Sequence, residues 1–334
     1  MNVAGTITEV ILIEEISQVG QARRRAKQLA EELGLNSVDS GRAALVATEL
    51  ATNILKHAGS GELHLRVVPG RGAEGIEIIA IDRGPGFEAL RCLRDGFSTG
   101  GTKGEGLGSV SRQSQVFDVF ADGRGSVVLS RIFPALVTDL RIGVNQHAMR
   151  NESACGDVWH LAINPHHLSA LIIDGLGHGP DAEEAALCGA AAFSARPFDD
   201  PEALFMNMQG AMNGTRGGAG AIAQYDCLNG TLRFAGIGNI GARLLTPEGS
   251  RGMASYPGIV GAQIRKVKTF TYAEASSRLL VMYSDGLQSR WDLEDYQGLR
   301  LQHPATIAAV LYRDFCRGRD DITIMALDLE QACG

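Results

Sequence analysis

The 334-residue chain has little of what marks several classes of protein. Aromatic residues make up 6% of it, and its six cysteines form no CxxC pair, which argues against a zinc ribbon and a disulfide scaffold. No apolar run approaches the roughly 20 residues of a membrane helix. The N-terminus also lacks the basic segment and apolar core of a signal peptide. We therefore expect a cytoplasmic protein.

An excess of positive charge is missing as well. The chain has 31 basic and 38 acidic residues and a net charge of -7, so it carries no basic footprint for nucleic acid. The acidic excess falls in the second half, where it could serve cations. The length allows two domains. We expect them at 1–135 and 140–330, joined by a segment near residues 134–144.

Hydrophobic periodicity predicts helices, strands and a hairpin in the first half. The second half reads as strands that alternate with loops, plus two helices. The expected elements of the first half are a strand at 5–13, helices at 18–33 and 40–57, strands at 62–68 and 76–82, a helix at 107–116 and a hairpin at 117–132. Those of the second half are strands at 168–174, 219–226, 231–235, 279–284 and 322–328, with helices at 182–194 and 201–212.

Three features in the first half favour a nucleotide pocket. Glu49 and Asn53 lie at i and i+4 and therefore share one face of the helix. The strand at 76–82 ends in Asp82, whose carboxylate can accept from an exocyclic amine, and glycines follow it in DRGPG. A glycine-rich stretch, STGGTKGEGLGS at 98–109, then leads into a helix and offers N–H groups to phosphates. Alone, each is typical of a solvated helix face or a flexible loop; together and in this order they point to ATP.

The segments ATELATN, IDRGPGF and GFSTGGTKGEGLG resemble the N, G1 and G2 boxes of the GHKL ATPase/kinase family, above all its RsbT-like serine kinases. The resemblance covers about residues 5–132 and implies a Bergerat-type α/β sandwich. It implies that Asn53 binds Mg2+, that Glu49 orients or deprotonates the attacking hydroxyl, and that Asp82 holds the adenine amino group. It also implies a set of further nucleotide contacts: Gly84, Gly86 and Ser126 at the base, and Gly104, Gly106 and Gly108 at the phosphates.

Two positions in the glycine-rich stretch bear on turnover. Lys103 is either a γ-phosphate contact or a solvated loop residue. Glu105 stands where many relatives have no acid, and its charge repels phosphates unless it points outward. ATP binding is therefore better supported than phosphate transfer.

Acidic residues recur at strand ends in the second half, each beside glycine or another acid. They lie in CGDVW (155–159), IIDGLGHG (172–179), YSDGL (283–287) and GRDDIT (318–323). One such aspartate is commonly a turn former, but four of them indicate hard oxygen ligands for Mg2+ or Mn2+. Two cations in one site activate water and stabilise a phosphoryl transition state.

These motifs, together with GIGN (236–239), resemble the SpoIIE/RsbX branch of the metal-dependent PPM phosphatases in kind and in order. The resemblance spans about residues 140–329 and implies two face-to-face sheets flanked by helices, an αββα sandwich. It implies that Asp174 bridges two cations and that the Gly175 carbonyl binds one. Asp285 and Asp320 would complete the second ion, with Asp321 as the substitute for Asp320. Asp157 would reach the site through water or a further ion.

The sequence allows two interpretations for each of two further polar residues, His178 and Arg216. His178 either protonates the leaving seryl oxygen or structures its loop, and Arg216 either holds the substrate phosphate or is an ordinary turn residue. Asn239 is expected to cap a turn. His160, which fits no zinc pattern, is expected at the surface.

Both resemblances together imply a bifunctional regulator that phosphorylates and dephosphorylates Ser/Thr on a STAS-type anti-sigma antagonist or a stressosome scaffold protein. Fusion of the two activities would raise the effective concentration of each at one partner. One alternative keeps the phosphatase and makes the first half an ATP sensor that does not transfer phosphate. Another is a non-catalytic, anti-sigma-like binding module. The expected cofactors are ATP with Mg2+ in the first half and two Mn2+ or Mg2+ in the second.

Overall fold

The chain is described from a computed structural model that covers residues 1–87, 106–134, 137–150, 152–246, 249–273, 275 and 278–331. Its contacts divide the chain into two compact units. Unit 1 comprises Met1–Ile7, Arg141–Asp292 and Asp314–Gly334, and unit 2 comprises Thr8–Leu140 and Leu293–Arg313. Among the described helices, none is both long and apolar enough to cross a membrane.

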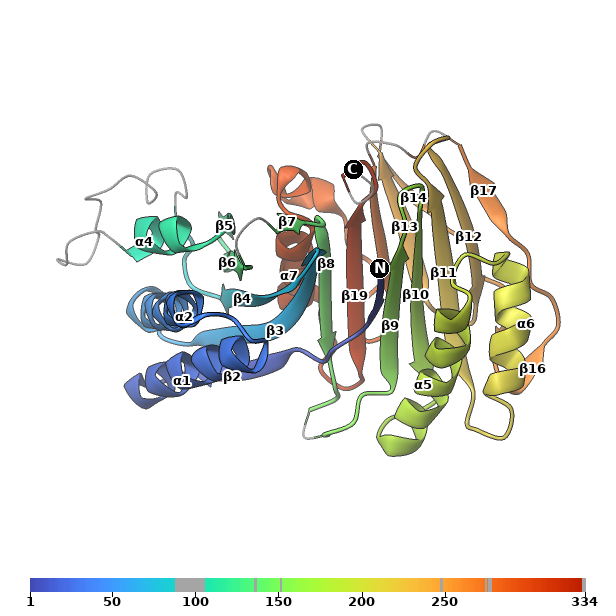
Figure 1. The fold of residues 1–334 in the computed structure, drawn as a ribbon, viewed down its shortest axis with the longest axis horizontal. Coiled ribbons are helices and arrows are strands. Elements are labelled where there is room, and N and C mark those ends of the chain that lie inside the picture. Colours follow the sequence, from blue (N-terminus) through green and yellow to red (C-terminus); the bar gives the residue numbers. More distant parts are fainter. Residues whose placement is uncertain are drawn as a thin grey trace. The chain divides into compact units, whose positions relative to one another are not determined.

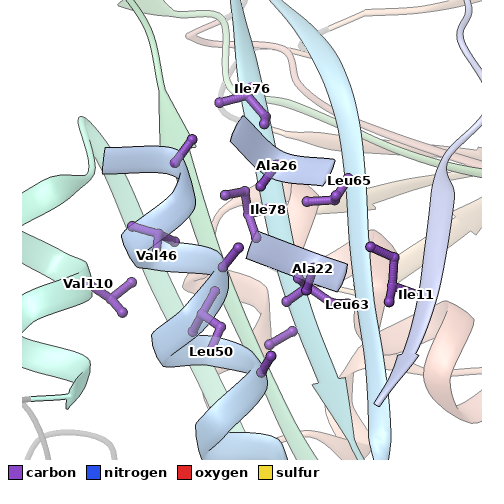
Figure 2. Close-up of a cluster of buried hydrophobic side chains, with 14 of the residues drawn as sticks. Ile11, Ala22, Ala26, Val46, Leu50, Leu63, Leu65, Ile76, Ile78 and Val110 are labelled. Atoms are coloured by element: carbon purple, nitrogen blue, oxygen red, sulfur yellow. The ribbon is translucent and has the colours of Figure 1, made fainter. Parts of the chain in front are cut away.

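Unit 2 is built on an antiparallel sheet with the order β2-β3-β4-β6-β5 (Figure 1). Helices α1 and α2 pack against one face, and alternate strand residues such as Leu63, Leu65, Ile76 and Ile78 form the core beneath them (Figure 2). The elements are β2 (Glu9–Ile13), α1 (Ile16–Glu32), α2 (Ser37–His57), β3 (Gly61–Arg71), β4 (Glu74–Asp82), α4 (Gly106–Gln113), β5 (Val116–Asp122), β6 (Gly125–Ile132) and β7 (Thr138–Asp139).

Helix α2 begins earlier than the sequence predicted, and the reason is a capping residue. The Asn36 side chain accepts from the backbone N–H groups of Val38 and Asp39, which satisfies two of the helix's free donors. The prediction had placed the start at residue 40. The helix ends before Gly59, whose φ of 79° suits a residue without a side chain.

The second face of the unit 2 sheet is covered by a segment from late in the chain. This segment contains the short 3-10 helices η1 (Leu293–Asp295) and η2 (Leu299–Leu301) and most of α7 (Pro304–Phe315). The ring of Tyr312 packs edge-on against His64 of β3, with ring centroids 5.2 Å apart. Because His64 alternates with the core residues Leu63 and Leu65, it points to the face away from α1 and α2.

Unit 1 consists of two sheets packed face to face (Figure 1). One has the order β1-β9-β10-β11-β12-β17 and the other β14-β13-β18-β19-β8. Helices α5 (Pro180–Ala195) and α6 (Pro201–Ala211) cover the first sheet, with Phe193 and Leu204 in the core between them. The strands of the first sheet are β1 (Asn2–Ala4), β9 (Asp157–Ile163), β10 (His167–Gly175), β11 (Gly218–Asp226), β12 (Thr231–Ile237) and β17 (Phe270–Tyr272). Those of the second are β8 (Ile142–His147), β13 (Gly241–Thr246), β14 (Gly249–Gly252), β18 (Leu279–Tyr283) and β19 (Ile322–Asp328).

The units do not coincide with the continuous ranges 1–135 and 140–330 expected from the sequence. The chain's first residues belong to unit 1, because β1 pairs with β9 and places Asn2 opposite Ala162. Residues 293–313 belong to unit 2, because they supply the cover for its sheet. Of the strand expected at 5–13, only β2 (Glu9–Ile13) forms, and the strand before it, β1 (Asn2–Ala4), lies in the other unit's sheet.

Candidate active sites

The first candidate site lies in unit 1, where strands bring four aspartates to neighbouring ends. Asp157 begins β9 and lies directly opposite Asp174 near the end of antiparallel β10. Asp285 follows β18, and Asp320 precedes β19, the neighbour of β18 in the second sheet. The pair Asp157 and Asp174 is separated from the pair Asp285 and Asp320 by more than 100 residues of sequence, so only the fold brings the two pairs together.

The electrostatics confirm that these acids act on one another. Burial raises the pKa of Asp174 to about 9, and the charges of Asp157, Asp285, Asp320 and Asp321 add to the shift. Burial also raises the pKa of Asp157, to about 7. The pKa of Asp285 is raised by burial and by the charge of Asp320. Groups that shift one another in this way share a small volume, which is the arrangement that a divalent cation relieves.

Asp157 is the most enclosed of these carboxylates. It is 1% exposed, and its Oδ2 accepts from the Ser284 hydroxyl at 2.6 Å. The same hydroxyl accepts from the Thr323 N–H at 2.9 Å. Among the described residues, Asp157 Oδ1 accepts no hydrogen bond of ordinary length. A buried carboxylate oxygen without a donor fits a cation or an ordered water, because leaving it bare is costly.

The neighbouring acids Asp320 and Asp321 differ in their surroundings. Asp321 is buried, and its two oxygens accept from the backbone N–H groups of Met149 at 2.6 Å and Gly156 at 2.7 Å. Asp320 is half-buried, and from the described residues it accepts one hydrogen bond, from the Asp321 N–H at 3.0 Å. Asp321 therefore holds the loop together, and Asp320 keeps lone pairs for a ligand.

Gly175 ends β10, and His178 lies in the loop that follows. A side chain at Gly175 would lie 2.1 Å from the Ala182 carbonyl oxygen, so only glycine fits at this turn. His178 is half-exposed, and its Nδ1 lies 3.3 Å from Glu152 Oε1. A carboxylate in that position orients the ring.

The structure gives specific partners to Arg216, which had two interpretations, and to Asn239, which was expected to cap a turn. The Arg216 guanidinium pairs with Asp181 at 2.7 Å on the surface, which agrees with an ordinary loop arginine. Asn239 donates to Asp285 Oδ2 at 2.8 Å and so fixes one candidate ligand instead of only capping a turn. His160 was expected at the surface, but it is buried, and burial lowers its pKa to about 4.

The donor set at this site consists of carboxylate oxygens. Such oxygens suit Mg2+ and Mn2+. Among the described residues, no three carboxylate, imidazole or thiol groups close around one point as a complete cage. Backbone carbonyls and water would therefore supply a large share of each coordination shell, as is usual for Mg2+.

The second candidate site lies in unit 2 at the end of β4. Asp82 Oδ1 accepts from the Gly84 N–H at 2.8 Å, and Oδ2 accepts from the Ser126 hydroxyl. Ser126 lies directly opposite Asp82 on β6. A side chain at Gly86, where φ is 69°, would lie 2.1 Å from the Asp122 carbonyl oxygen. Gly86 thus allows its backbone to approach that of Asp122, close to the Asp82 carboxylate that Gly84 and Ser126 hold in place.

Helices α2 and α4 bring together the other predicted residues of this site. A side chain added at Gly106 would lie 3.4 Å from the Asn53 amide and 3.7 Å from Glu49 Oε2. The N-terminus of α4 therefore faces the two polar residues of α2, both of which are half-buried. Gly108 is buried in α4. Lys103 and Gly104 lie outside the described residues.

Sequence reasoning missed two residues of the unit 1 site. Ser284 stands beside Asp285 in the motif YSDGL, but its link to Asp157 depends on two strands from different sheets. Glu152 precedes the first motif and meets His178 only through the folded loops. The one signal in the sequence was that Ser284, a polar residue, directly precedes the candidate ligand Asp285.

Comparison with known proteins finds relatives for both halves. Residues 13–130 match the family model of the histidine kinase-like ATPase domain. The serine/threonine-protein kinase RsbT of Bacillus subtilis is 41% identical over 99 residues, which are 29% of this chain and 74% of that protein. The chain belongs to the RsbT family.

The remainder is similar to phosphatases. The phosphoserine phosphatase RsbX of Bacillus subtilis is 24% identical over 148 residues, 43% of this chain and 73% of that protein. A solved structure from the bacterial stressosome, described as a modular system adapted to control secondary messenger signalling, matches with a TM-score of 0.52 and 24% identity. The match covers 55% of this chain and 97% of that one. The predicted fold class, a Bergerat-type sandwich with a PPM-type αββα sandwich, is confirmed, and the chain joins an RsbT-like domain to an RsbX-like phosphatase domain.

Proposed function

We propose that this RsbT-family chain adds phosphate to, and removes it from, serine or threonine on one partner protein. Unit 1 would be the metal-dependent phosphatase and unit 2 the ATP-dependent kinase. The observation that carries the proposal is the convergence of the unit 1 aspartates, where burial, together with the charges of the neighbouring aspartates, raises the pKa of Asp174 to about 9. The partner would be a STAS-type anti-sigma antagonist or a stressosome scaffold protein, as the likeness to RsbT and RsbX suggests.

In the phosphatase unit, Asp174, the Gly175 carbonyl, Asp285 and Asp320 would hold two Mn2+ or Mg2+, with Asp157 reaching the site through water. When bound, the cations activate water and stabilise the charge of phosphoryl transfer. Asn239 would keep the Asp285 carboxylate in place. His178, held by Glu152, would give its proton to the seryl oxygen that leaves.

In the kinase unit, Asp82 would accept from the adenine amino group, with Gly84, Gly86 and Ser126 around the base. Asn53 would hold Mg2+ at the phosphates, and Glu49, one helical turn away, would take the proton of the attacking hydroxyl. The position of Gly106 against both side chains supports this arrangement. Lys103, Gly104 and Gly108 would complete the phosphate contacts.

A phosphatase assay on a phosphorylated STAS protein tests the first activity. We expect Mn2+- or Mg2+-dependent phosphate release by the wild type and a loss of at least about 100-fold with Asp174→Asn or Asp285→Asn, since each removes a charged ligand. Asp199→Asn, a change of the same type at a half-exposed residue of unit 1, is the matched control. Release that is independent of metal, or equal in all variants, would exclude the proposed site.

Labelled ATP tests the second activity on the unphosphorylated protein. We expect label on the partner with the wild type and none with Glu49→Ala, while ATP affinity stays within about threefold because Glu49 acts on the hydroxyl and not on the nucleotide. If Glu49→Ala transfers label at the wild-type rate, Glu49 is not the base.

One observation favours a second candidate, in which unit 2 senses ATP and regulates the phosphatase. The segment 293–313 belongs to unit 2, yet it lies in the chain between the candidate metal ligands Asp285 and Asp320. At its end, Arg313 donates to Asp122 at 3.2 Å, and the Arg83 side chain donates to the Arg313 carbonyl. Arg83 directly follows Asp82, so the adenine pocket is bonded to the segment that leads to Asp320.

The sensor hypothesis is tested with the Glu49→Ala variant, which separates binding from transfer. If it is right, saturating ATP changes the rate of phosphate release by this variant, and Asp82→Asn abolishes the change. A rate that stays the same with and without ATP rejects sensing and leaves the kinase as the role of unit 2.

A further inference from the structure

Beside the unit 1 aspartates lies a depression of about 450 Å3 that the proposed chemistry does not use. Its volume is within the range of small ligand sites. Three of the five residues that line it are arginines. The lining residues are Gln288, Ser289, Arg290, Arg317 and Arg319, which we call the arginine pocket.

The pocket is formed by the two chain segments that carry candidate metal ligands. Arg319 immediately precedes Asp320, and Arg290 follows Asp285 by five positions. The segments are bonded to each other: the Gln288 N–H donates to the Phe315 carbonyl at 3.0 Å, and the Arg317 N–H donates to the Gly286 carbonyl at 2.9 Å. An antiparallel bridge between Leu287 and Cys316 lies between these bonds. The arginines are therefore carried by a paired backbone.

Among the described residues these arginines have no acidic partner, in contrast to two other arginines of unit 1. Arg216 pairs with Asp181 and Arg233 with Asp200. Within the part of the chain that the structure describes, the side chains of Arg290, Arg317 and Arg319 make no ion pair within 4.0 Å and no hydrogen bond, although the charge of Arg317 acts on Asp285. Three exposed guanidinium groups in a chain of net charge -7 thus gather where anions would be drawn in.

We infer that the arginine pocket binds carboxylate side chains that flank the phosphorylated residue of the protein substrate. The guanidinium fork matches a carboxylate with two parallel hydrogen bonds, which a lysine cannot do. The inference rests on the proposed phosphatase function, whose substrate class it narrows to phosphoproteins with acidic residues beside the phosphoserine or phosphothreonine. The pocket would hold the flanking chain while the aspartate site holds the phosphate.

Binding of three peptides to the full chain, measured by fluorescence anisotropy with Mn2+, tests the inference without turnover. Each peptide carries the same non-hydrolysable phosphonate in place of phosphoserine, flanked by aspartates, by neutral residues or by lysines. We expect the aspartate peptide to bind the wild type at least about tenfold more tightly than the neutral one, since each charge-assisted hydrogen bond of this kind is worth about a factor of ten. The preference should fall with added salt.

The variants are Arg290→Ala with Arg319→Ala, and as control Arg265→Ala, an exposed arginine of unit 1 away from the pocket. Arg317 is left in place because its charge acts on Asp285. The double variant should lose the preference for the aspartate peptide, and the control should keep it. Charge reversal, Arg290→Glu with Arg319→Glu, should turn the preference toward the lysine peptide.

Two results would overturn the inference. One is a wild type that binds the aspartate and neutral peptides equally. The other is a double variant that loses affinity for both peptides to the same extent, which would mean that the arginines hold the phosphoryl group itself. Failure of the proposed function is seen separately, as an absence of metal-dependent hydrolysis of p-nitrophenyl phosphate by the wild type, and it leaves the binding comparison valid.

Discussion

Asp157 and Asp174 are direct cross-strand neighbours on β9 and β10, and both are carboxylates in a mostly buried site. Like charges at directly opposite positions of an antiparallel pair are destabilising. Here burial raises both pKa values, to about 7 for Asp157 and about 9 for Asp174, and the charge of Asp157 adds to the shift of Asp174. In the absence of a cation, the fold therefore tolerates this pair by keeping protons on it, at a cost that grows with pH.

Asp174→Asn should stabilise the chelated protein at pH 8. The unfolded chain loses the Asp174 proton near pH 3.8, whereas the folded chain keeps it to about pH 9. The favourable contribution of this group is therefore complete below about pH 3.8 and is lost as the pH rises to about 9. An amide has no proton to retain, so the variant should gain several degrees in Tm at pH 8 and little at pH 5, at ~2–4 °C per kcal/mol.

Thermal unfolding in a chelator between pH 5 and 9 measures this, with Asp199→Asn as the control that should gain nothing. Addition of Mn2+ should raise the Tm of the wild type and not that of D174N, because a ligand that binds only the folded state stabilises it. Equal pH profiles for wild type and D174N would show that Asp174 is not held in its protonated form.

Ser284→Ala should destabilise unit 1 by about 1–3 kcal/mol. The hydroxyl donates to Asp157 and accepts from the Thr323 N–H, so its removal leaves two buried polar groups without partners. Because this hydrogen bond lowers the pKa of Asp157, its loss raises that pKa further, and the destabilisation should be larger at pH 8 than at pH 6.

Urea unfolding at both pH values, in chelator, measures the effect of Ser284→Ala. The matched control is Ser169→Ala on β10, because Ser169 is also fully buried but its hydroxyl has no hydrogen-bond partner among the described residues. This control should be nearly neutral. An equal loss of unfolding free energy in both variants would mean that removal of a buried serine hydroxyl, and not of the hydrogen bond to Asp157, causes the destabilisation.

The local parts of both sites could be predicted from the sequence. Asp82 and Asp174 each end an apolar strand and precede glycine, and these signals lie within a few residues of each other. The structure places both residues at strand ends, with Asp82 bonded to Gly84 and Asp174 opposite Asp157. Hydrophobic periodicity and turn residues are sufficient to place these aspartates at strand ends, because both signals depend only on residues within a single strand and the turn after it.

What could not be predicted depends on pairing between distant segments. The sequence of α7, PATIAAVLYRDF, is equally apolar whichever sheet it covers, so nothing in it assigns residues 293–313 to unit 2. The first strand was likewise predicted at 5–13, whereas the structure has β1 at 2–4 and β2 at 9–13, and the change from one sheet to another occurs in the extended segment between them. The bond between Ser284 and Asp157 required the register of two sheets.

Asp82→Asn should weaken ATP binding at least tenfold. Both carboxylate oxygens already accept hydrogen bonds, from the Gly84 N–H and the Ser126 hydroxyl. An amide turns its NH2 group toward one of these donors, which disturbs the pocket, and it presents no second acceptor to an adenine amino group. Titration with a fluorescent ATP analogue measures the loss. The control is Glu74→Gln at the exposed start of the same strand, and unchanged affinity in D82N would remove Asp82 from the base pocket.

Glu77→Gln should destabilise unit 2 by about 3–5 kcal/mol, because it leaves two buried guanidinium groups without their shared partner. Glu77 accepts from Arg66 at 2.7 Å and from Arg131 at 2.5 and 2.8 Å, and all three side chains are at most 3% exposed. The two arginines lower the pKa of Glu77, so its contribution is present above about pH 4.5 and is lost as the pH falls through the folded-state value. Urea unfolding should show a difference at pH 7 that narrows on acidification, and Glu74→Gln should show none.

The same variant should also loosen the late segment 293–313. Arg131 pairs with Asp139 at 2.5 Å, and Asp139 meets the His303 ring at 2.8 Å, so the charged chain from Glu77 ends at the residue just before α7. Removal of the Glu77 charge takes one acidic partner from Arg131 and changes the field that holds His303. Amide hydrogen exchange in α7 should therefore speed up in Glu77→Gln by more than it does in α5 of unit 1. Equal rates in both helices would mean that the segment is held by apolar packing and not by this network.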